Sequence, residues 1–211
     1  MNKILKKFVF TGIIVVLLFA YMSTSFAQTD IKTVHTVRYG DTLWKIAVRY
    51  EVGLSEIINA NPHLENPDLI YPGQRINIPN FDDVKAKEME VIRLVNAERA
   101  KHGLKPLAYN WELSRVARFK SKDMAQVGYF SHTSPTYGSP FKMMKDFGIN
   151  YSYAGENIAM GYRTPEDVMK GWMNSPGHRR NILSPNFSQI GVGYAVNNQG
   201  TPYWTQMFIH Q

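Results

Sequence analysis

The sequence predicts an α+β protein built from two units. Three observations support this. Residues 34–79 show a short extended segment, two short apolar helical patterns and a closing alternating segment, and residues 88–211 show helical patterns followed by two alternating segments. The chain has 211 residues, 44% of them hydrophobic, and no cysteine, so apolar cores rather than disulfides must stabilise both units.

The first 27 residues predict a secretory signal peptide. Lys3, Lys6 and Lys7 precede the apolar run 8–22, and Ser25-Phe26-Ala27 gives a small-x-small cleavage pattern. The run is shorter than the ~20 apolar residues that span a bilayer, so an uncleaved anchor is the alternative. We therefore expect a secreted chain with no transmembrane segment after cleavage.

Charge excludes one class of partner. Cleavage after residue 27 removes three lysines and no acid, which lowers the formal net charge from +7 to +4. The positive surplus lies in residues 81–211, where it suits an anionic surface such as a cell envelope. No basic stripe alternates with aromatic residues, so we expect no nucleic-acid partner.

The first unit has a strand–helix–helix–strand pattern. An extended start at residues 35–37 is followed by the turn 39–42, whose Asp and Thr can cap a helix. Apolar residues then recur at helical spacing in 43–50 and again from residue 54, and an edge strand, 75–79, closes the unit.

This unit resembles the lysin-motif (LysM) domain over its whole length. The resemblance rests on VRYGDTLWKIA, on the Asn61-Pro62 pair and on LIYPGQRINIP. It implies a βααβ module that binds the N-acetylglucosamine-containing glycan of peptidoglycan or chitin in a groove between two turns. The residues that the resemblance places in this groove are Gly40, Asp41, Thr42, Leu43, Asn61, Pro62, Leu69, Ile70 and Tyr71. In the alternative interpretation, Leu69 and Tyr71 are core residues and the Gly and Asp only make a turn.

The second unit begins after a short linker, predicted at residues 80–87. Gly103 can end a first helix, and Asn110, Ser139 and Thr164 can cap the next three. Strands at 190–196 and 203–209 flank a turn. The pattern predicts an α+β domain over residues 88–211.

Three separated residues of this domain could carry chemistry. His132, Glu156 and His178 each lie beside Gly, Pro or Ser, which places them in loops or at element ends, where functional side chains usually lie. Pro176-Gly177 is expected to break the preceding helix and turn His178 toward the other two. For Arg179 and Arg180, contact with solvent or carbonyl oxygens is the expectation and contact with a ligand the alternative.

The phrases around these residues resemble the CAP superfamily, and in particular its cysteine-free bacterial SCP-type branch, which includes exported proteins linked to spore formation. The phrases are LVNAERAKHGLKPL, YFSHTSP, AGENIAMGY, WMNSPGHRRNIL and FSQIGVGYA. The resemblance implies an α-β-α sandwich whose cleft holds two His and usually two acidic side chains. His132, Glu156 and His178 match three of these, but Ser175 stands where the second Glu is expected.

Several chemistries remain open for these three residues. Two imidazoles and a carboxylate could hold a divalent metal such as zinc with an open position, or Glu156 could act as a base with a histidine as acid. Neither supplies a nucleophile, since cysteine, a nucleophile-elbow serine and HExxH are all absent from the sequence.

We therefore expect an exported, wall-associated or spore-layer-associated protein. LysM would bind peptidoglycan, and the CAP domain would bind a lipid, glycan or protein, or act in signalling. The alternatives are a metal-dependent hydrolase of peptide or wall material and a structural coat or wall component.

Overall fold

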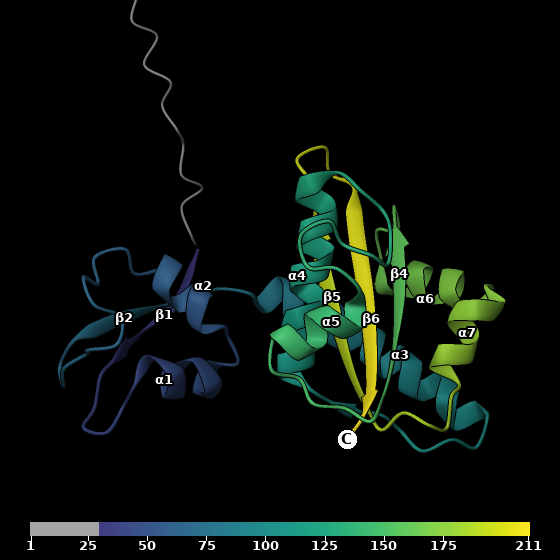
Figure 1. The fold of residues 1–211 in the computed structure, drawn as a ribbon, viewed down its shortest axis with the longest axis horizontal. Coiled ribbons are helices and arrows are strands. Elements are labelled where there is room, and N and C mark those ends of the chain that lie inside the picture. The colour runs from purple at the N-terminus through teal and green to yellow at the C-terminus, as the bar shows by residue number, and fades with distance from the viewer. Residues whose placement is uncertain (1–29) are drawn as a thin grey trace, which may run out of the picture.

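The computed structural model describes residues 30–211 and has the two predicted units (Figure 1). The predicted signal peptide lies outside the described residues. Within residues 30–211, no helix combines the length and apolar character needed to cross a membrane.

The N-terminal unit has the predicted βααβ order. It contains β1 (Ile31–Thr36), α1 (Leu43–Tyr50), α2 (Leu54–Asn59) and β2 (Arg75–Pro79). The two strands pair antiparallel, and the inner faces of both helices and of β2 bury a small core that includes Ile46, Ile57 and Ile76. Thr42 caps α1 as predicted, since its hydroxyl accepts a hydrogen bond from the Lys45 N–H at 3.1 Å.

The C-terminal unit is a three-layer α-β-α sandwich. Its elements are α3 (Asp82–Lys101), β3 (Ala108–Tyr109), α4 (Trp111–Val127), α5 (Pro140–Asp146), β4 (Tyr153–Met160), α6 (Pro165–Met173), α7 (Pro176–Ile182), β5 (Gln189–Val196) and β6 (Pro202–His210). The sheet order is β3-β5-β6-β4, with β3 parallel to β5 and the other pairs antiparallel, so β4 is an edge strand.

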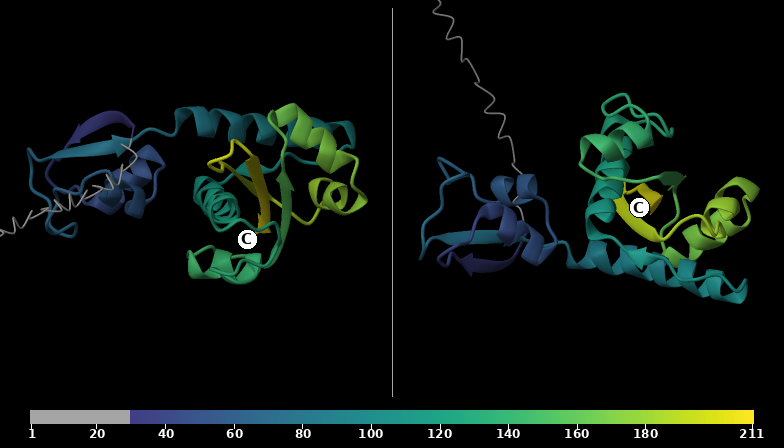
Figure 2. Two further views of the ribbon diagram at one scale, coloured as in Figure 1. Left: turned by 90° about the horizontal axis from the view of Figure 1, so that it is seen from above. Right: turned by 60° about the horizontal axis from the view of Figure 1, so that its bottom comes forward.

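The helices divide between the two faces of this sheet (Figure 2). Apolar residues of α4 and α5 pack with Met207 and Ile209 on one face. Those of α3, α6 and α7 pack with Trp204 and Phe208 on the other. Each face of β6 therefore contributes to a different core, which explains why its residues 202–209 are all buried.

Two features differ from the sequence-based expectations. Helix α3 begins at Asp82, so most of the predicted linker 80–87 is helical; Asp82 and Asp83 lie in its first turn, where acidic side chains favour a helix start. Glu156 lies inside β4 and not in a loop or at an element end, whereas His178 is in the first turn of α7, as expected for an element end.

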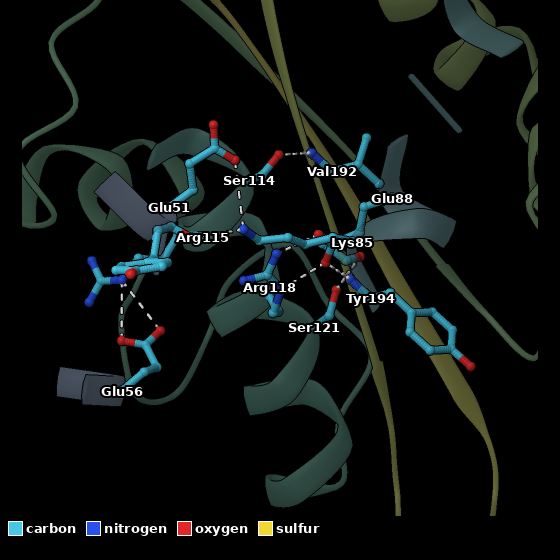
Figure 3. A network of polar contacts seen from close by, with 12 residues as sticks. Glu51, Glu56, Lys85, Glu88, Ser114, Arg115, Arg118, Ser121, Val192 and Tyr194 are labelled. Atoms are coloured by element: carbon cyan, nitrogen blue, oxygen red, sulfur yellow. Dashed lines mark hydrogen bonds and ion pairs between the residues drawn. The ribbon is translucent and has the colours of Figure 1, made fainter. Parts of the chain in front are cut away.

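The junction between the two units contains a network of polar contacts (Figure 3). Lys85 of α3 reaches back to the LysM unit, where it bonds the Tyr50 carbonyl oxygen at 3.2 Å and lies 3.6 Å from the Glu51 carboxylate. Arg115 of α4 pairs with Glu56 of α2 at 3.4 Å. None of these residues belongs to the predicted glycan groove, so the junction leaves those nine positions free of interdomain hydrogen bonds.

A buried ion pair lies behind this interface. Arg118 donates to Glu88 at 2.8 Å, and Glu88 also accepts the Tyr194 N–H at 3.0 Å (Figure 3). Burial raises the pKa of Glu88, while the Arg118 guanidinium opposes that rise. The pair ties α3, α4 and β5 together directly under the LysM contact.

Candidate functional site in the CAP-like domain

His132 and Glu156 meet at the edge of the sheet. His132 lies in the loop after α4 and Glu156 in β4, and the His132 Nδ1 is 2.7 Å from the Glu156 Oε1. The two side chains differ in exposure: 54% for His132 and 2% for Glu156. A buried carboxylate is thus presented to a solvent-facing imidazole, as expected if the pair faces a ligand.

The environment of Glu156 favours its neutral form. Burial raises the pKa of this carboxyl, while the His132 hydrogen bond and the nearby Lys120 charge act in the opposite direction. Its second oxygen, Oε2, is buried and has no hydrogen-bond partner among residues 30–211. That oxygen is a buried acceptor whose hydrogen-bonding capacity is unused within residues 30–211.

His178 lies near this pair without bonding to it. It is partly buried on α7, and both burial and the neighbouring His132 lower its pKa below the usual 6.5, which keeps its imidazole neutral at pH 7. Within residues 30–211, no three His, Cys, Asp or Glu side chains are arranged to hold a metal ion. His132, Glu156 and His178 therefore do not form such a group in the described part of the chain, and a metal site there stays a prediction.

A buried lysine holds the His132 loop in place. The Lys120 ammonium, which is 0% exposed, donates to the carbonyl oxygens of Ser131 and His132 at 2.8 and 2.9 Å. One helical turn away, Asp123 accepts hydroxyl groups of Tyr129, Ser134 and Thr136 at 2.6–2.7 Å. The sequence analysis missed both residues, although Lys120 occupies a position seven residues after Leu113 on the apolar face of α4.

A second network fixes α7 against β4. Asn181 donates to the Asn157 side chain at 2.8 Å and to the Glu156 carbonyl oxygen at 3.2 Å. Asn157 in turn donates to Gln206 at 2.9 Å and to the His178 carbonyl oxygen at 3.1 Å. The strand that carries Glu156 and the helix that carries His178 are therefore held in register.

In the LysM unit, the structure separates the nine predicted groove residues into two groups. The side chains of Asp41, Leu43 and Asn61 are engaged inside the protein: Leu43 is in the core, and Asn61, 1% exposed, bonds both backbone groups of Asn77 and the Ile57 carbonyl oxygen. The Asp41 carboxylate accepts from His35 and Arg38, and these hydrogen bonds lower its pKa to about 2.

The other predicted groove residues line the surface. Leu69 and Tyr71 are 51% and 60% exposed, so the interpretation that placed them in the core is wrong. Gly40, Thr42 and Pro62 are exposed as well, and Ile70 is partly buried. Sequence analysis did not single out as ligand contacts Tyr39, which is 98% exposed in the first predicted turn, and Trp44, which is 55% exposed just after it.

Comparison with known proteins agrees with both units. Residues 92–208 match the model of the cysteine-rich secretory protein family (CAP), and residues 35–79 match the LysM domain model. The chain therefore belongs to the CAP family and carries a LysM domain in front of its CAP domain.

Three relatives illustrate the match. Uncharacterized protein YkwD of Bacillus subtilis is 60% identical over 126 residues, which are 60% of this chain and 48% of YkwD, so the chain spans about half the length of that relative. Spore coat assembly protein ExsA of Bacillus cereus is 49% identical over 47 residues, 22% of this chain and 7% of ExsA. A crystal structure of an SCP-domain extracellular protein of Bacillus anthracis matches with a TM-score of 0.56 and 33% identity, covering 66% of this chain and 47% of that one.

Proposed function

We propose that the chain is an exported protein that binds peptidoglycan through its LysM domain and presents the CAP domain as a binding module at the cell wall. One observation carries the proposal: a LysM domain whose predicted glycan-binding loops expose Leu69 and Tyr71 to solvent. An exposed aromatic ring and an exposed leucine side chain suit a sugar, which has an apolar face as well as hydroxyl groups.

The arrangement of the two domains supports a wall-associated role. The interface around Arg115 and Lys85 holds the CAP domain close to the LysM domain, while the predicted glycan face takes no part in that interface. Binding of the glycan would raise the effective concentration of the CAP domain at its own ligand.

Sedimentation with purified peptidoglycan tests the proposal. The chain from residue 28 onward should co-sediment, and Tyr71→Ala should weaken binding about tenfold, as expected when a contact worth ~1.4 kcal/mol is lost. The control is Phe141→Ala, which removes a similarly exposed aromatic side chain (45%) from the CAP domain. Equal sedimentation of Tyr71→Ala and the wild type would refute the assigned glycan face.

A hydrolase is the second candidate, favoured by the His132–Glu156 contact. A carboxyl group with a raised pKa next to an imidazole is a combination that general acid–base catalysis uses. If the CAP domain hydrolyses wall peptides or casein, new amino groups should appear over time and Glu156→Gln should abolish their release. If amino groups appear no faster than in substrate without the protein, the hydrolase candidate is refuted and the binding role is retained.

A structural role in a spore or wall layer is the third candidate. ExsA is named a spore coat assembly protein, and its similarity to this chain is confined to 22% of the chain. Fluorescent fusions with and without residues 28–80 would test it. Localisation that survives the deletion would remove the LysM domain as the anchor.

A further inference from the structure

A groove of about 630 Å³ lies between α7 and the start of β4 and is not used by the His132–Glu156 pair. Helix α7 packs beside α6 and β4 (Figure 1). The residues of the groove that matter here are Tyr153, Pro176, Arg179, Arg180, Leu183 and Pro185. Asn181 also lines the groove and donates to the Glu156 carbonyl oxygen at 3.2 Å, so the groove adjoins the strand that carries Glu156.

The groove carries positive charge with no acid to neutralise it. Arg179 and Arg180 are both exposed, and neither takes part in an ion pair or a side-chain hydrogen bond in the described part of the chain. The segments 147–155 and 174–189, which supply the groove, contain no Asp or Glu. The next acid along β4, Glu156, is already paired with His132. Two unneutralised guanidinium groups in one groove attract an oxyanion.

The walls of the groove are fixed before any ligand arrives. Arg99 is 1% exposed, and its Nη1 donates to the carbonyl oxygens of Ile182 and Ser184 at 2.8 and 2.7 Å. Asn181 ties the same helix to β4 through Asn157. A pre-formed groove loses little conformational entropy on binding, so modest contacts can give measurable affinity.

An aromatic surface forms one side of the groove. The Tyr153 ring is 48% exposed and lies 5.0 Å from the Phe187 ring, which in turn stacks on Phe208 at 5.3 Å. Such a stack holds Tyr153 against the core while leaving one face of its ring available. Pro176, Leu183 and Pro185 add apolar lining beside the polar Asn181 and Ser184.

From this combination we infer that the groove binds the carboxyl-terminal end of a short peptide, such as the peptide stems of peptidoglycan. The arginines would donate hydrogen bonds to the terminal carboxylate, and Tyr153 with the apolar lining would contact small side chains. This inference names a ligand class for the CAP domain and rests on the proposed role of that domain as a binding module at the wall.

The lining favours a peptide over a phosphate polymer. A carboxylate and a phosphate both fit the planar fork of arginine. A polyol phosphate, however, has no apolar groups to place against Tyr153, Leu183 and Pro185, whereas a peptide terminus has an apolar side chain next to its carboxylate.

Isothermal titration calorimetry on the chain from residue 28 onward tests this inference with diacetyl-Lys-D-Ala-D-Ala as the probe. The free acid should bind at least tenfold more tightly than its C-terminal amide. Arg179→Gln and Arg180→Gln should each weaken binding of the free acid about tenfold, and added salt should weaken it in the wild type. The control is Arg163→Gln, which removes an exposed arginine that lines a different cavity next to α6.

Each other outcome overturns the inference. Equal affinity for the free acid and its amide would exclude the arginines as the carboxylate site. So would wild-type affinity in both arginine variants, provided that their unfolding midpoints are unchanged. If inorganic phosphate displaces the peptide and binds more tightly than the peptide does, the groove would be assigned to a phosphate ligand instead.

The peptidoglycan sedimentation assay keeps this inference separate from the proposed function. Arg179→Gln and Arg180→Gln lie outside the LysM domain, so both should still co-sediment. A wild-type chain that sediments with peptidoglycan but does not bind the peptide would refute only the groove assignment. A wild-type chain that does not sediment would refute the LysM proposal.

Discussion

Replacing Gly193 with alanine should force α4 away from the sheet. An added Cβ at this position would lie 2.1 Å from the Ala117 carbonyl carbon and from the Arg118 nitrogen, and 2.3 Å from the Ala117 oxygen. Non-bonded carbon atoms rest at about 3.5–4.0 Å, so the helix backbone must retreat by more than about 1 Å. Backbone atoms cannot rotate out of the way as the end of a side chain can.

The cost follows from what α4 buries. Its inner face carries Leu113, Val116, Ala117 and Met124, all at most 1% exposed. A gap of 0.5–1 Å forfeits roughly a quarter to a half of each dispersion contact, and overpacking typically costs about 1–3 kcal/mol. Because the clash is with backbone, we expect Gly193→Ala to lower the free energy of unfolding by about 3 kcal/mol. For a chain of this size, that corresponds to a fall in Tm of about 6–12 °C.

Urea unfolding followed by tryptophan fluorescence measures this change. Trp172 and Trp204 are 1% and 0% exposed in the CAP core and so report its unfolding. The matched control is Gly177→Ala, whose Cβ would meet only the end of the Arg180 side chain at 3.9 Å. The control should be neutral or up to about 1 kcal/mol more stable, since alanine is the better helix former. A midpoint for Gly193→Ala within experimental error of the wild type would show that α4 does not lie against β5 as described.

Three further changes test other parts of the structure. Asn61→Ala should destabilise the LysM domain by about 2–3 kcal/mol in thermal unfolding, because it leaves the two partly buried Asn77 backbone groups unpaired. Lys120→Met should speed amide hydrogen exchange in the loop around His132; exchange as slow as in the wild type would argue against the anchoring role. The pKa of Glu156 is raised in the folded state, so above pH 4.5 the folded state binds more protons than the unfolded state. The free energy of unfolding of the wild type should therefore fall as pH rises from 4.5, and urea titrations should show a smaller fall for Glu156→Gln. A parallel decline in both proteins would contradict the assignment.

Local signals in the sequence were enough to place several helix starts. Thr42, Asn110, Ser139 and Thr164 were predicted as caps, and each accepts a hydrogen bond from the backbone N–H three residues on. A cap is decided by neighbours within one turn, so its chemistry is visible in a short window of sequence. The order of elements in the LysM domain was predictable for the same reason.

Strand β4 was not predicted because its pattern depends on tertiary packing. Residues 155–159 are all buried, since the strand has one helical layer on each side. A segment buried on both faces loses the apolar–polar alternation that marks a strand. Pro176 was interpreted as a helix breaker, yet it also occupies the first turn of α7, where a missing N–H costs nothing.

The sequence by itself determined which residues could meet at the candidate site, because His132, Glu156 and His178 were singled out from their phrases. Only the tertiary structure decided that His132 and Glu156 touch while His178 stays apart, and that Lys120 and Asp123 hold the loop. It also decided that Asn61 is a buried clamp and not a surface ligand. The hydrogen bonds that build the site join residues 11 to 25 positions apart in the sequence. Whether such residues meet depends on how helices and strands pack together, and no local window of sequence contains that information.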